Sequence, residues 1–243
     1  MKRRVWIVPL ILIVVLCIQG CVGFKTVRGS GKEAAEERQV SDFTGVELAT
    51  VGSLYIELGD KEELRIEADD NLLRYFETQV RGETLEIKSR DKVTLLPNEP
   101  IYFYLTVKEL DTVALSGLGS VEFTDDIEVE QLSIAISGGG NVEIQGIKAG
   151  ALQVNISGVG NMSVDGGEVE EQTVTISGGG NYQARDLKST ETEVRVSGVG
   201  SATVHARDHL KVTISGGGSV KYAGNPTVEQ NVSGVGHVER IGE

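Results

Sequence analysis

Seven serines occur in the same tetrapeptide, Ser-Gly-x-Gly, and serines beside glycines are used in other proteins for nucleophilic attack or for holding a phosphate. They are Ser116, Ser137, Ser157, Ser177, Ser197, Ser215 and Ser233. A serine nucleophile needs a neighbouring base, and a phosphate-binding loop is followed by a helix with a lysine. No base stands at a fixed offset from these serines, and none is the central serine of Gly-x-Ser-x-Gly. The sequence therefore predicts a repeated structural turn, with no catalytic residue and no enzyme activity.

Histidine and aspartate are the other candidates for chemistry, because they bind metal ions. His205 and His209 are four residues apart, a spacing that would suit zinc on a helix. Residues 204–210 predict a strand-to-turn passage instead, and so an ordinary surface pair. The Ser-Gly-Gly-Gly-Asn units resemble calcium-binding nonapeptides, but those need Asp and a shorter period. Asp125 and Asp126 fit a solvated turn, so we expect no metal site and no cofactor.

Cys21 is the residue with a predicted chemical modification. A basic start, an apolar run over residues 5–18 and the tetrapeptide Ile18-Gln-Gly-Cys21 have the form of a bacterial lipoprotein signal. The glutamine departs from the usual small or aliphatic residue at its position. Residues 1–20 are expected to be the signal peptide, and Cys21 the lipid attachment site that binds the chain to a membrane. An uncleaved N-terminal anchor helix is the alternative.

Charge and cysteine content limit the partners and the compartment. Removal of the signal leaves Cys21 as the only cysteine, which excludes a disulfide within the chain. Without Lys2, Arg3 and Arg4, the 20 remaining Lys and Arg face 36 Asp and Glu, a net charge of −16. Such a surface repels nucleic acid, so no nucleic-acid partner is expected. The predicted location is the cell envelope. Val22 replaces the aspartate that retains lipoproteins at the inner membrane, which favours the outer membrane in a Gram-negative host.

The spacing of the repeated serines indicates the architecture that positions them. Successive serines are 21, 20, 20, 20, 18 and 18 residues apart. A constant turn with this period is typical of a solenoid, in which each repeat stacks on the next. We predict an all-β fold, a parallel β-helix with right-handed winding and rungs of roughly 20 residues. The regular repeats occupy 111–243, a less regular β-rich part of the solenoid occupies 40–110, and a polar, flexible tether occupies 21–39.

Apolar and polar residues alternate on both sides of each turn, as expected for half-buried strands. The residue before each serine is aliphatic: Leu115, Ile136, Ile156, Ile176, Val196, Ile214 and Val232. Stacking of the repeats places these residues in one inward column, with polar columns outside.

The glycines of the turn and the residue that follows them suggest how neighbouring rungs meet. We expect the second and fourth positions to adopt positive φ and to allow close approach of the rungs. Three repeats continue with asparagine, at Asn141, Asn161 and Asn181. At a strand spacing of about 4.8 Å these three side chains would form a ladder on the surface. The third turn position alternates between glycine and a larger apolar residue, which suggests that a branched side chain needs space on the next rung.

Several segments occur together in a combination typical of one family. They are Phe43-Thr-Gly-Val-Glu-Leu, Asp70-Asn-Leu-Leu, Leu85-Glu-Ile and the recurrent Ile-Ser-Gly-x-Gly-Asn units. From Phe43 to Gly236 the chain resembles the bacterial envelope family described as "putative auto-transporter adhesin, head GIN domain". The resemblance implies a β-helical fold and an envelope location, and the family's description implies adhesion. It supplies no catalytic residues.

Three functions are compatible with these features. The first is a lipid-anchored β-helical module that binds a protein or a glycan at the cell envelope, without catalysis. The second is a carbohydrate-active enzyme of the polysaccharide lyase or hydrolase type, suggested by fold analogy alone. The third is a structural envelope protein with no ligand. An exposed groove with several acidic residues near an Arg or Lys would favour the enzyme.

Overall fold

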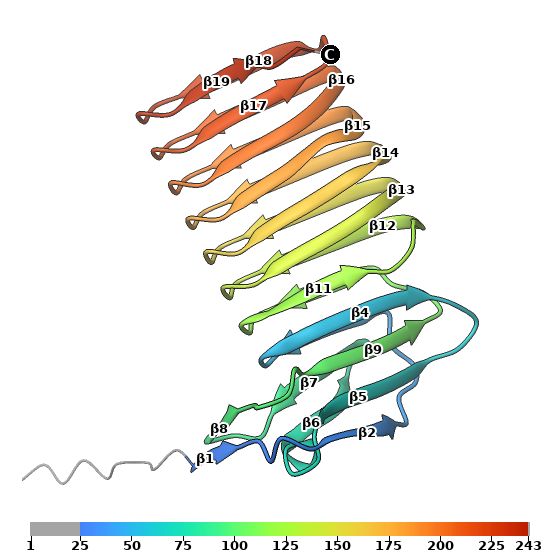
Figure 1. Ribbon diagram of the computed structural model, residues 1–243. Helices are drawn as coiled ribbons and strands as arrows, with labels where there is room; N and C mark the ends of the chain where they lie inside the picture. Colours follow the sequence, from blue (N-terminus) through green and yellow to red (C-terminus); the bar gives the residue numbers. More distant parts are fainter. Residues whose placement is uncertain (1–24, 243) are drawn as a thin grey trace, which may run out of the picture.

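Parallel pairing between repeats builds the fold of residues 25–242, the part of the chain described by the structure, which is a computed structural model. Asn141 pairs with Asn161, and Asn161 pairs with Asn181, so each rung lies directly above the preceding one (Figure 1). The predicted all-β parallel solenoid is confirmed. Among residues 25–242 there is no α-helix, and the one 3-10 helix is η1 (Leu73–Tyr75).

The described strands follow one another along the chain in this order: β1 (Lys25–Arg28), β2 (Glu33–Arg38), β3 (Gly45–Ala49), β4 (Gly52–Leu58), β5 (Glu63–Asp69), β6 (Phe76–Arg81), β7 (Thr84–Ser89), β8 (Val93–Leu96), β9 (Tyr102–Val107), β10 (Thr112–Leu115), β11 (Gly119–Phe123), β12 (Ile127–Ile136), β13 (Asn141–Ile156), β14 (Asn161–Ile176), β15 (Asn181–Val196), β16 (Ser201–Ile214), β17 (Ser219–Ala223), β18 (Thr227–Val232) and β19 (His237–Arg240).

Each rung contributes to two opposite faces of the solenoid. The front face, which is toward the viewer in Figure 1, contains β5, β9, β4, β11, the first parts of β13 to β16, then β17 and β19. The back face contains β7, β3, β10, β12, the last parts of the same long strands, and β18. The Ser-Gly-x-Gly turns join the two faces at one edge, seen at the left in Figure 1.

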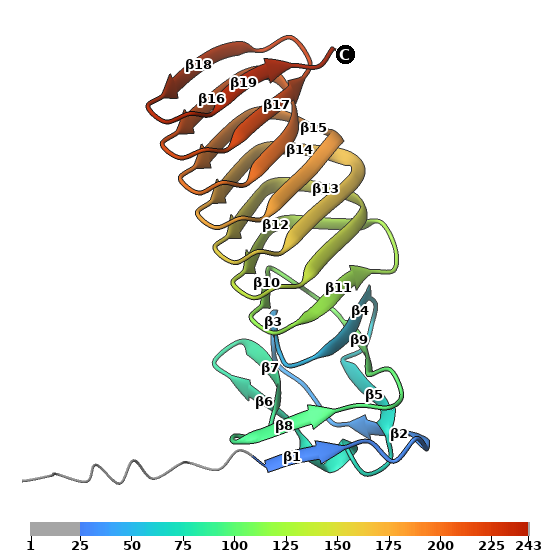
Figure 2. The same ribbon diagram turned by 60° about the vertical axis from the view of Figure 1, so that its left-hand side comes forward.

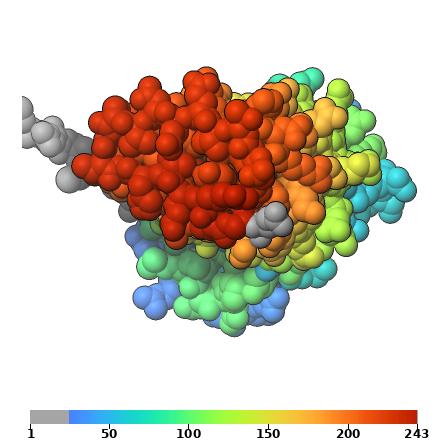
Figure 3. All heavy atoms as spheres, turned by 90° about the horizontal axis from the view of Figure 1, so that it is seen from above, coloured from blue at the N-terminus to red at the C-terminus, as the bar shows by residue number. Residues whose placement is uncertain are grey.

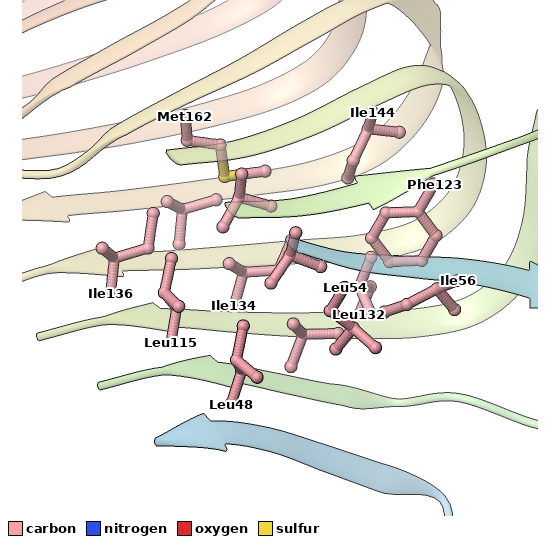
Figure 4. Close-up of a cluster of buried hydrophobic side chains, with 14 of the residues drawn as sticks. Leu48, Leu54, Ile56, Leu115, Phe123, Leu132, Ile134, Ile136, Ile144 and Met162 are labelled. Atoms are coloured by element: carbon pink, nitrogen blue, oxygen red, sulfur yellow. The ribbon is translucent and has the colours of Figure 1, made fainter. Parts of the chain in front are cut away.

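Aliphatic side chains fill the space between the two faces. Leu48, Leu115, Ile136 and Ile156 form one inward column of the back face, and each is at most 1% exposed. Figure 4 shows the first three of them. The view along the axis shows the last rungs stacked over the earlier ones (Figure 3). Burial of apolar surface, at about 25 cal/mol per Å², is the main force that holds such a stack together.

Contact with the preceding rung is what requires glycine at the second and fourth turn positions. A Cβ built on Gly158 would lie 2.0 Å from the carbonyl oxygen of Gly138, and one on Gly160 would lie 2.2 Å from that of Gly140. The expected close approach is therefore present. The expected positive φ is wrong, because no glycine of the seven turns, all of which lie in the described chain, adopts it. The turn closes without positive φ at these glycines, and the neighbouring backbone leaves no room for a side chain at the second and fourth positions.

The third turn position is less restricted. Val159 and Val199 are 70% and 76% exposed, and Gly179 lies between them on the intervening rung. A Cβ on Gly179 would meet these two side chains at 3.7 and 3.8 Å, which is ordinary van der Waals contact. We expected that the valines need a glycine on the rung between them. The contact distances show that an alanine at position 179 would also fit.

A buried polar cluster lies where the repeat shortens from 20 to 18 residues. The pairing of β15 with β16 shifts register within residues 183–191. There the fully buried Ser189 donates its hydroxyl proton to the carbonyl oxygen of His205 (2.9 Å), and Gln172 Nε2 donates to the Tyr182 hydroxyl (2.6 Å). Burial raises the pKa of Tyr182 far above its usual value, although the bond from Gln172 opposes this. These bonds satisfy the polar groups that the irregularity buries.

Antiparallel strands close the N-terminal end of the solenoid. β2 pairs with β5 and β5 pairs with β9, both antiparallel. Beside them β1 pairs with β8 in a separate two-stranded sheet, which is parallel (Figure 2). The prediction of a flexible tether is therefore wrong for residues 25–38, which contain β1 and β2. The polar composition of these residues gave no sign of a strand, because β2 is held mainly by backbone pairing and is largely exposed. Residues 21–24 of the predicted tether lie outside the described residues.

Asp69 connects three segments of this N-terminal cap. Its fully buried carboxylate accepts hydrogen bonds from the backbone N–H groups of Gly31 (2.6 Å), Asn98 (2.9 Å) and Glu99 (3.2 Å). Burial disfavours the charged form, but the backbone donors outweigh it and lower the pKa of Asp69 below its usual value.

The turn contact can be tested with two glycine substitutions. Gly158→Ala should lower the free energy of unfolding by about 3 kcal/mol, the upper end of the cost of overpacking, because its methyl group meets the Gly138 carbonyl. Gly179→Ala, the control in the next turn, should stay within about 0.5 kcal/mol of the wild type. Urea denaturation measures both. Equal destabilisation by the two variants would contradict the proposed contact.

The role of Asp69 predicts a pH dependence. Asp69→Asn should cost about 3 kcal/mol at pH 7, because three buried backbone donors lose a charged acceptor. The folded pKa lies below the unfolded one, so the wild type has this contribution above about pH 4 and loses it as the pH falls through the folded value. The exposed Asp70→Asn is the control and should change stability by no more than about 0.5 kcal/mol. Denaturation curves from pH 7 to 2 measure the effect, and parallel curves for wild type and Asp69→Asn would refute it.

Candidate binding face

A row of hydrogen-bonded side chains runs along the front face, with one residue from each rung. The side-chain amide of Asn161 donates to Asn141 Oδ1 (3.1 Å), and that of Asn181 donates to Asn161 Oδ1 (2.9 Å). The hydroxyl of Ser201 donates to Asn181 Oδ1 (2.7 Å). The structure thus brings the three asparagines of the expected ladder together, while their role in binding stays a prediction.

Strand register extends this row toward the N-terminal cap. Ser120 is the register partner of both Asn141 and Ser53, and its hydroxyl donates to that of Ser53 (2.9 Å). We call the whole row the polar ladder: Ser53, Ser120, Asn141, Asn161, Asn181 and Ser201. No member carries a charge, and the row offers an amide or a hydroxyl at every strand, about 4.8 Å apart.

Three tyrosine rings lie at the N-terminal end of the polar ladder, and we call them the tyrosine patch. Tyr102 is the register partner of Ser53, and Tyr104 is that of Tyr55. The rings of Tyr55 and Tyr104 are stacked, with centroids 5.5 Å apart and planes at 16°. The ring of Tyr102 lies 6.0 and 6.2 Å from these two. Tyr104 is the most open, with 38% of its surface exposed.

Charged groups lie around the tyrosine patch, and burial is the main cause that keeps the phenols of Tyr55 and Tyr104 neutral. The guanidinium of Arg65 lies 6.0 Å from the ring centroid of Tyr104. Burial, together with the carboxylate of Glu122, raises the pKa of Tyr55, and burial with the carboxylate of Glu67 raises that of Tyr104. Both phenols therefore stay protonated at neutral pH, and each keeps an O–H group that can donate a hydrogen bond.

Sequence reasoning missed the tyrosine patch. The available signal was the alternation Ile-Tyr-Phe-Tyr-Leu, which places Tyr102 and Tyr104 on one side of a strand and Phe103 on the other. Tyr55 could not be placed beside them, because the parallel pairing of β4 with β9 joins segments far apart in the chain and outside the regular repeat.

The repeated serines form a separate column at the edge of the solenoid. Their backbone continues the rung stacking, as in the bond from the Ser157 N–H to the Ile136 carbonyl (2.9 Å). The Ser116 hydroxyl donates to Glu47 Oε1 (2.7 Å). Within residues 25–242, none of these hydroxyls is hydrogen-bonded to a histidine.

The histidine pair lies in a different setting from the one expected. His205 and His209 both belong to strand β16 rather than to a strand-to-turn passage, and His205 Nδ1 is 3.1 Å from the carbonyl oxygen of Arg185. In the part of the chain that the structure describes, no group of three or more His, Cys, Asp or Glu side chains is arranged to hold a metal ion.

The predicted lipid attachment site, Cys21, and the signal segment lie outside the described residues. Between residues 25 and 242, no helix has the length and apolar character needed to cross a membrane.

An open groove of about 640 Å³ runs along the solenoid beside the front face and combines acidic and basic side chains. Lys148 is hydrogen-bonded to Glu128, and Arg207 to Glu168, while Asp126 lies at one end of the lining. The bond and charge of Glu128 raise the pKa of Lys148.

The stacked parallel rungs, the continuous polar ladder and the repeated glycine turns define a class, that of parallel β-solenoids with long, regular side faces. The chain belongs to the family described as "putative auto-transporter adhesin, head GIN domain", which matches residues 42–226. A comparison with curated proteins finds no match.

Solved structures share the fold. A "putative adhesin" from Bacteroides fragilis NCTC 9343 is 27% identical, with a TM-score of 0.84 over 88% of this chain and 100% of the other. A "putative adhesin" from Parabacteroides merdae ATCC 43184 is 25% identical, with a TM-score of 0.75 over 89% and 99%. A "putative lipid binding protein" from Parabacteroides distasonis ATCC 8503 is 23% identical, with a TM-score of 0.75 over 89% and 100%, and this likeness concerns the fold alone.

Proposed function

We propose that the protein is an exported, lipid-anchored module for binding or adhesion at the bacterial cell envelope, and that it has no catalytic activity. The observation that carries this proposal is the polar ladder, in which the same uncharged groups recur on successive rungs. A recognition surface of a solenoid repeats along its axis, whereas an active site is assembled once. Membership of an adhesin family supports an envelope or surface protein.

The anchor in this proposal is Cys21, which becomes the acylated first residue after signal removal. Several acyl chains give stable membrane attachment where one chain does not. Strand β1 begins at Lys25, four residues later, and four extended residues span at most about 14 Å. The N-terminal cap would then lie next to the bilayer, with the rungs stacked away from it, and the outer membrane is the location favoured by Val22.

The partner is a protein or a glycan rather than a nucleic acid. After signal removal the chain carries a net charge of −16, which repels a phosphate backbone. The only membrane contact in the proposal is through the lipid on Cys21.

A carbohydrate-active enzyme is the second candidate, because the mixed-charge groove has the composition that such an enzyme would need. Two basic groups of that groove, Lys148 and Arg207, are hydrogen-bonded to carboxylates, which argues against either of them acting as the free base of a lyase. Incubation of the full chain with polygalacturonate and alginate distinguishes the two functions. Release of unsaturated or reducing ends would favour the enzyme, and their absence together with cell adhesion would favour the binding module.

The anchoring prediction concerns Cys21. In cells that produce the full chain, mass spectrometry should identify an acylated N-terminal peptide beginning at Cys21, and the protein should partition to membranes. Cys21→Ser should abolish both, and cells producing it should lose adhesion to immobilised glycoproteins, because the folded module is no longer attached. A Cys21→Ser protein that still partitions fully to membranes would contradict the lipoprotein proposal. Unchanged adhesion of cells that lack the whole chain would contradict the adhesion proposal.

A further inference from the structure

We propose that the tyrosine patch and the polar ladder form one site for a linear, uncharged glycan that lies along the solenoid axis. This rests on the proposed binding function and specifies its ligand class. Strand register makes the site continuous, because Tyr102 is the partner of Ser53, Ser53 of Ser120, and Ser120 of Asn141. The same column continues through Asn161 and Asn181, so the site extends over most of the front face (Figure 1).

The position of the ladder strands decides how a partner can be recognised. β13, β14 and β15 each have a parallel neighbour on both sides, so their backbone N–H and C=O groups are engaged within the sheet. An extended peptide therefore cannot join this face as an added strand, which is the usual way that a sheet binds a peptide. Recognition on this face is through side chains.

The ladder asparagines retain hydrogen-bonding capacity for a ligand. An amide group has two N–H donors and an oxygen with two lone pairs. In the ladder, Asn161 uses one donor toward Asn141 and one lone pair toward Asn181. One donor and one lone pair remain, and the side chain of Asn161 is exposed. A sugar hydroxyl, which both donates and accepts, complements this pair of groups.

Charge favours an uncharged ligand. No ionisable side chain occurs in the column between Tyr102 and Ser201, and the adjacent column of the front face carries Glu122 and Glu143. These carboxylates repel uronic acids, sulfated sugars and phosphates. A linear chain of neutral hexoses carries hydroxyl groups along its whole length and has no charge for these carboxylates to repel.

The tyrosine patch supplies the apolar part of the site. One side of a hexopyranose ring presents C–H groups, which pack against aromatic carbon, and tyrosine combines such a surface with a hydroxyl at its tip. Tyr104 is more than one-third exposed, and Tyr55 and Tyr102 are half-buried beside it. Tyrosine is among the residue types that most often contribute a large share of the binding energy when a partner buries them.

The test measures binding of cellohexaose, chitohexaose, mannohexaose and, as an anionic comparison, hexagalacturonate to the mature protein that begins at Cys21, kept in detergent. Isothermal titration gives the affinity, and tyrosine fluorescence gives a second readout because the chain's single tryptophan, Trp6, lies in the signal segment. We expect at least one neutral hexamer to bind more tightly than hexagalacturonate. Tyr104→Ala should weaken that binding about tenfold, a typical result for an aromatic anchor, and Tyr104→Phe should weaken it less.

The ladder has a matched control on the opposite face. Asn161→Ala should weaken binding about threefold or more, as expected for loss of hydrogen-bonding groups. Asn155→Ala removes the same side chain from β13 on the back face and should leave the affinity unchanged. Circular dichroism and thermal midpoints establish that each variant is folded.

Three results would overturn the inference. They are no binding of any neutral hexamer at millimolar concentration, tighter binding of hexagalacturonate, and an equal loss of affinity in Asn155→Ala and Asn161→Ala. If the hexamers fail to bind while cells carrying the full chain still adhere to protein-coated surfaces, the glycan site is wrong and the binding function stands. If adhesion is also absent, the proposed function fails as well.

Discussion

The whole solenoid depends on the backbone contact between each Ser-Gly-x-Gly turn and the rung before it. The second and fourth glycines lie so close to carbonyl oxygens of the preceding turn that no side chain fits, and the amide of the third residue donates back to that turn, as Val159 does to Gly138 (3.2 Å). A rung displaced by even one residue would bring a larger residue into this contact. The contact therefore locks the register, and locked register is what turns a repeated sequence into columns of identical groups.

The polar ladder is a direct consequence of that register. Asn141, Asn161 and Asn181 occupy the same place after the turn, so their side chains meet at hydrogen-bond distance, and inward residues such as Ile136 and Ile156 stack for the same reason. A rigid row of groups needs little ordering when a ligand binds, which reduces the entropic cost of association. At the N-terminal end, β2 and β5 stop the parallel stacking, and the tyrosine patch lies where the regular repeat gives way to this cap.

Periodicity was sufficient to predict the regular part of the molecule, because there each residue's environment is set by its neighbours one repeat away. The inward column, the parallel stacking and the position of the asparagines all follow from the spacing of Ser157 and its equivalents. Where long-range contacts decide the structure, the sequence was insufficient. The polar strand β2 is ordered by pairing with β5, and the tyrosine patch arises from the pairing of β4 with β9. The prediction that the turn glycines allow close approach is confirmed, and the prediction that they adopt positive φ is wrong. A glycine in a sequence is compatible with either cause, so the sequence alone does not distinguish them.

Native-state hydrogen exchange of the Val159 amide tests the central claim most directly. The side chain of Val159 is 70% exposed, so a turn that merely connects two strands would exchange this amide quickly. If the turns are stacked as tightly as the strands, the Val159 amide exchanges only through global unfolding, with the same free energy of opening as amides within β13. Fast exchange at Val159 while the amides of β13 remain protected would contradict the account, because the turns would then follow the register of the strands instead of determining it.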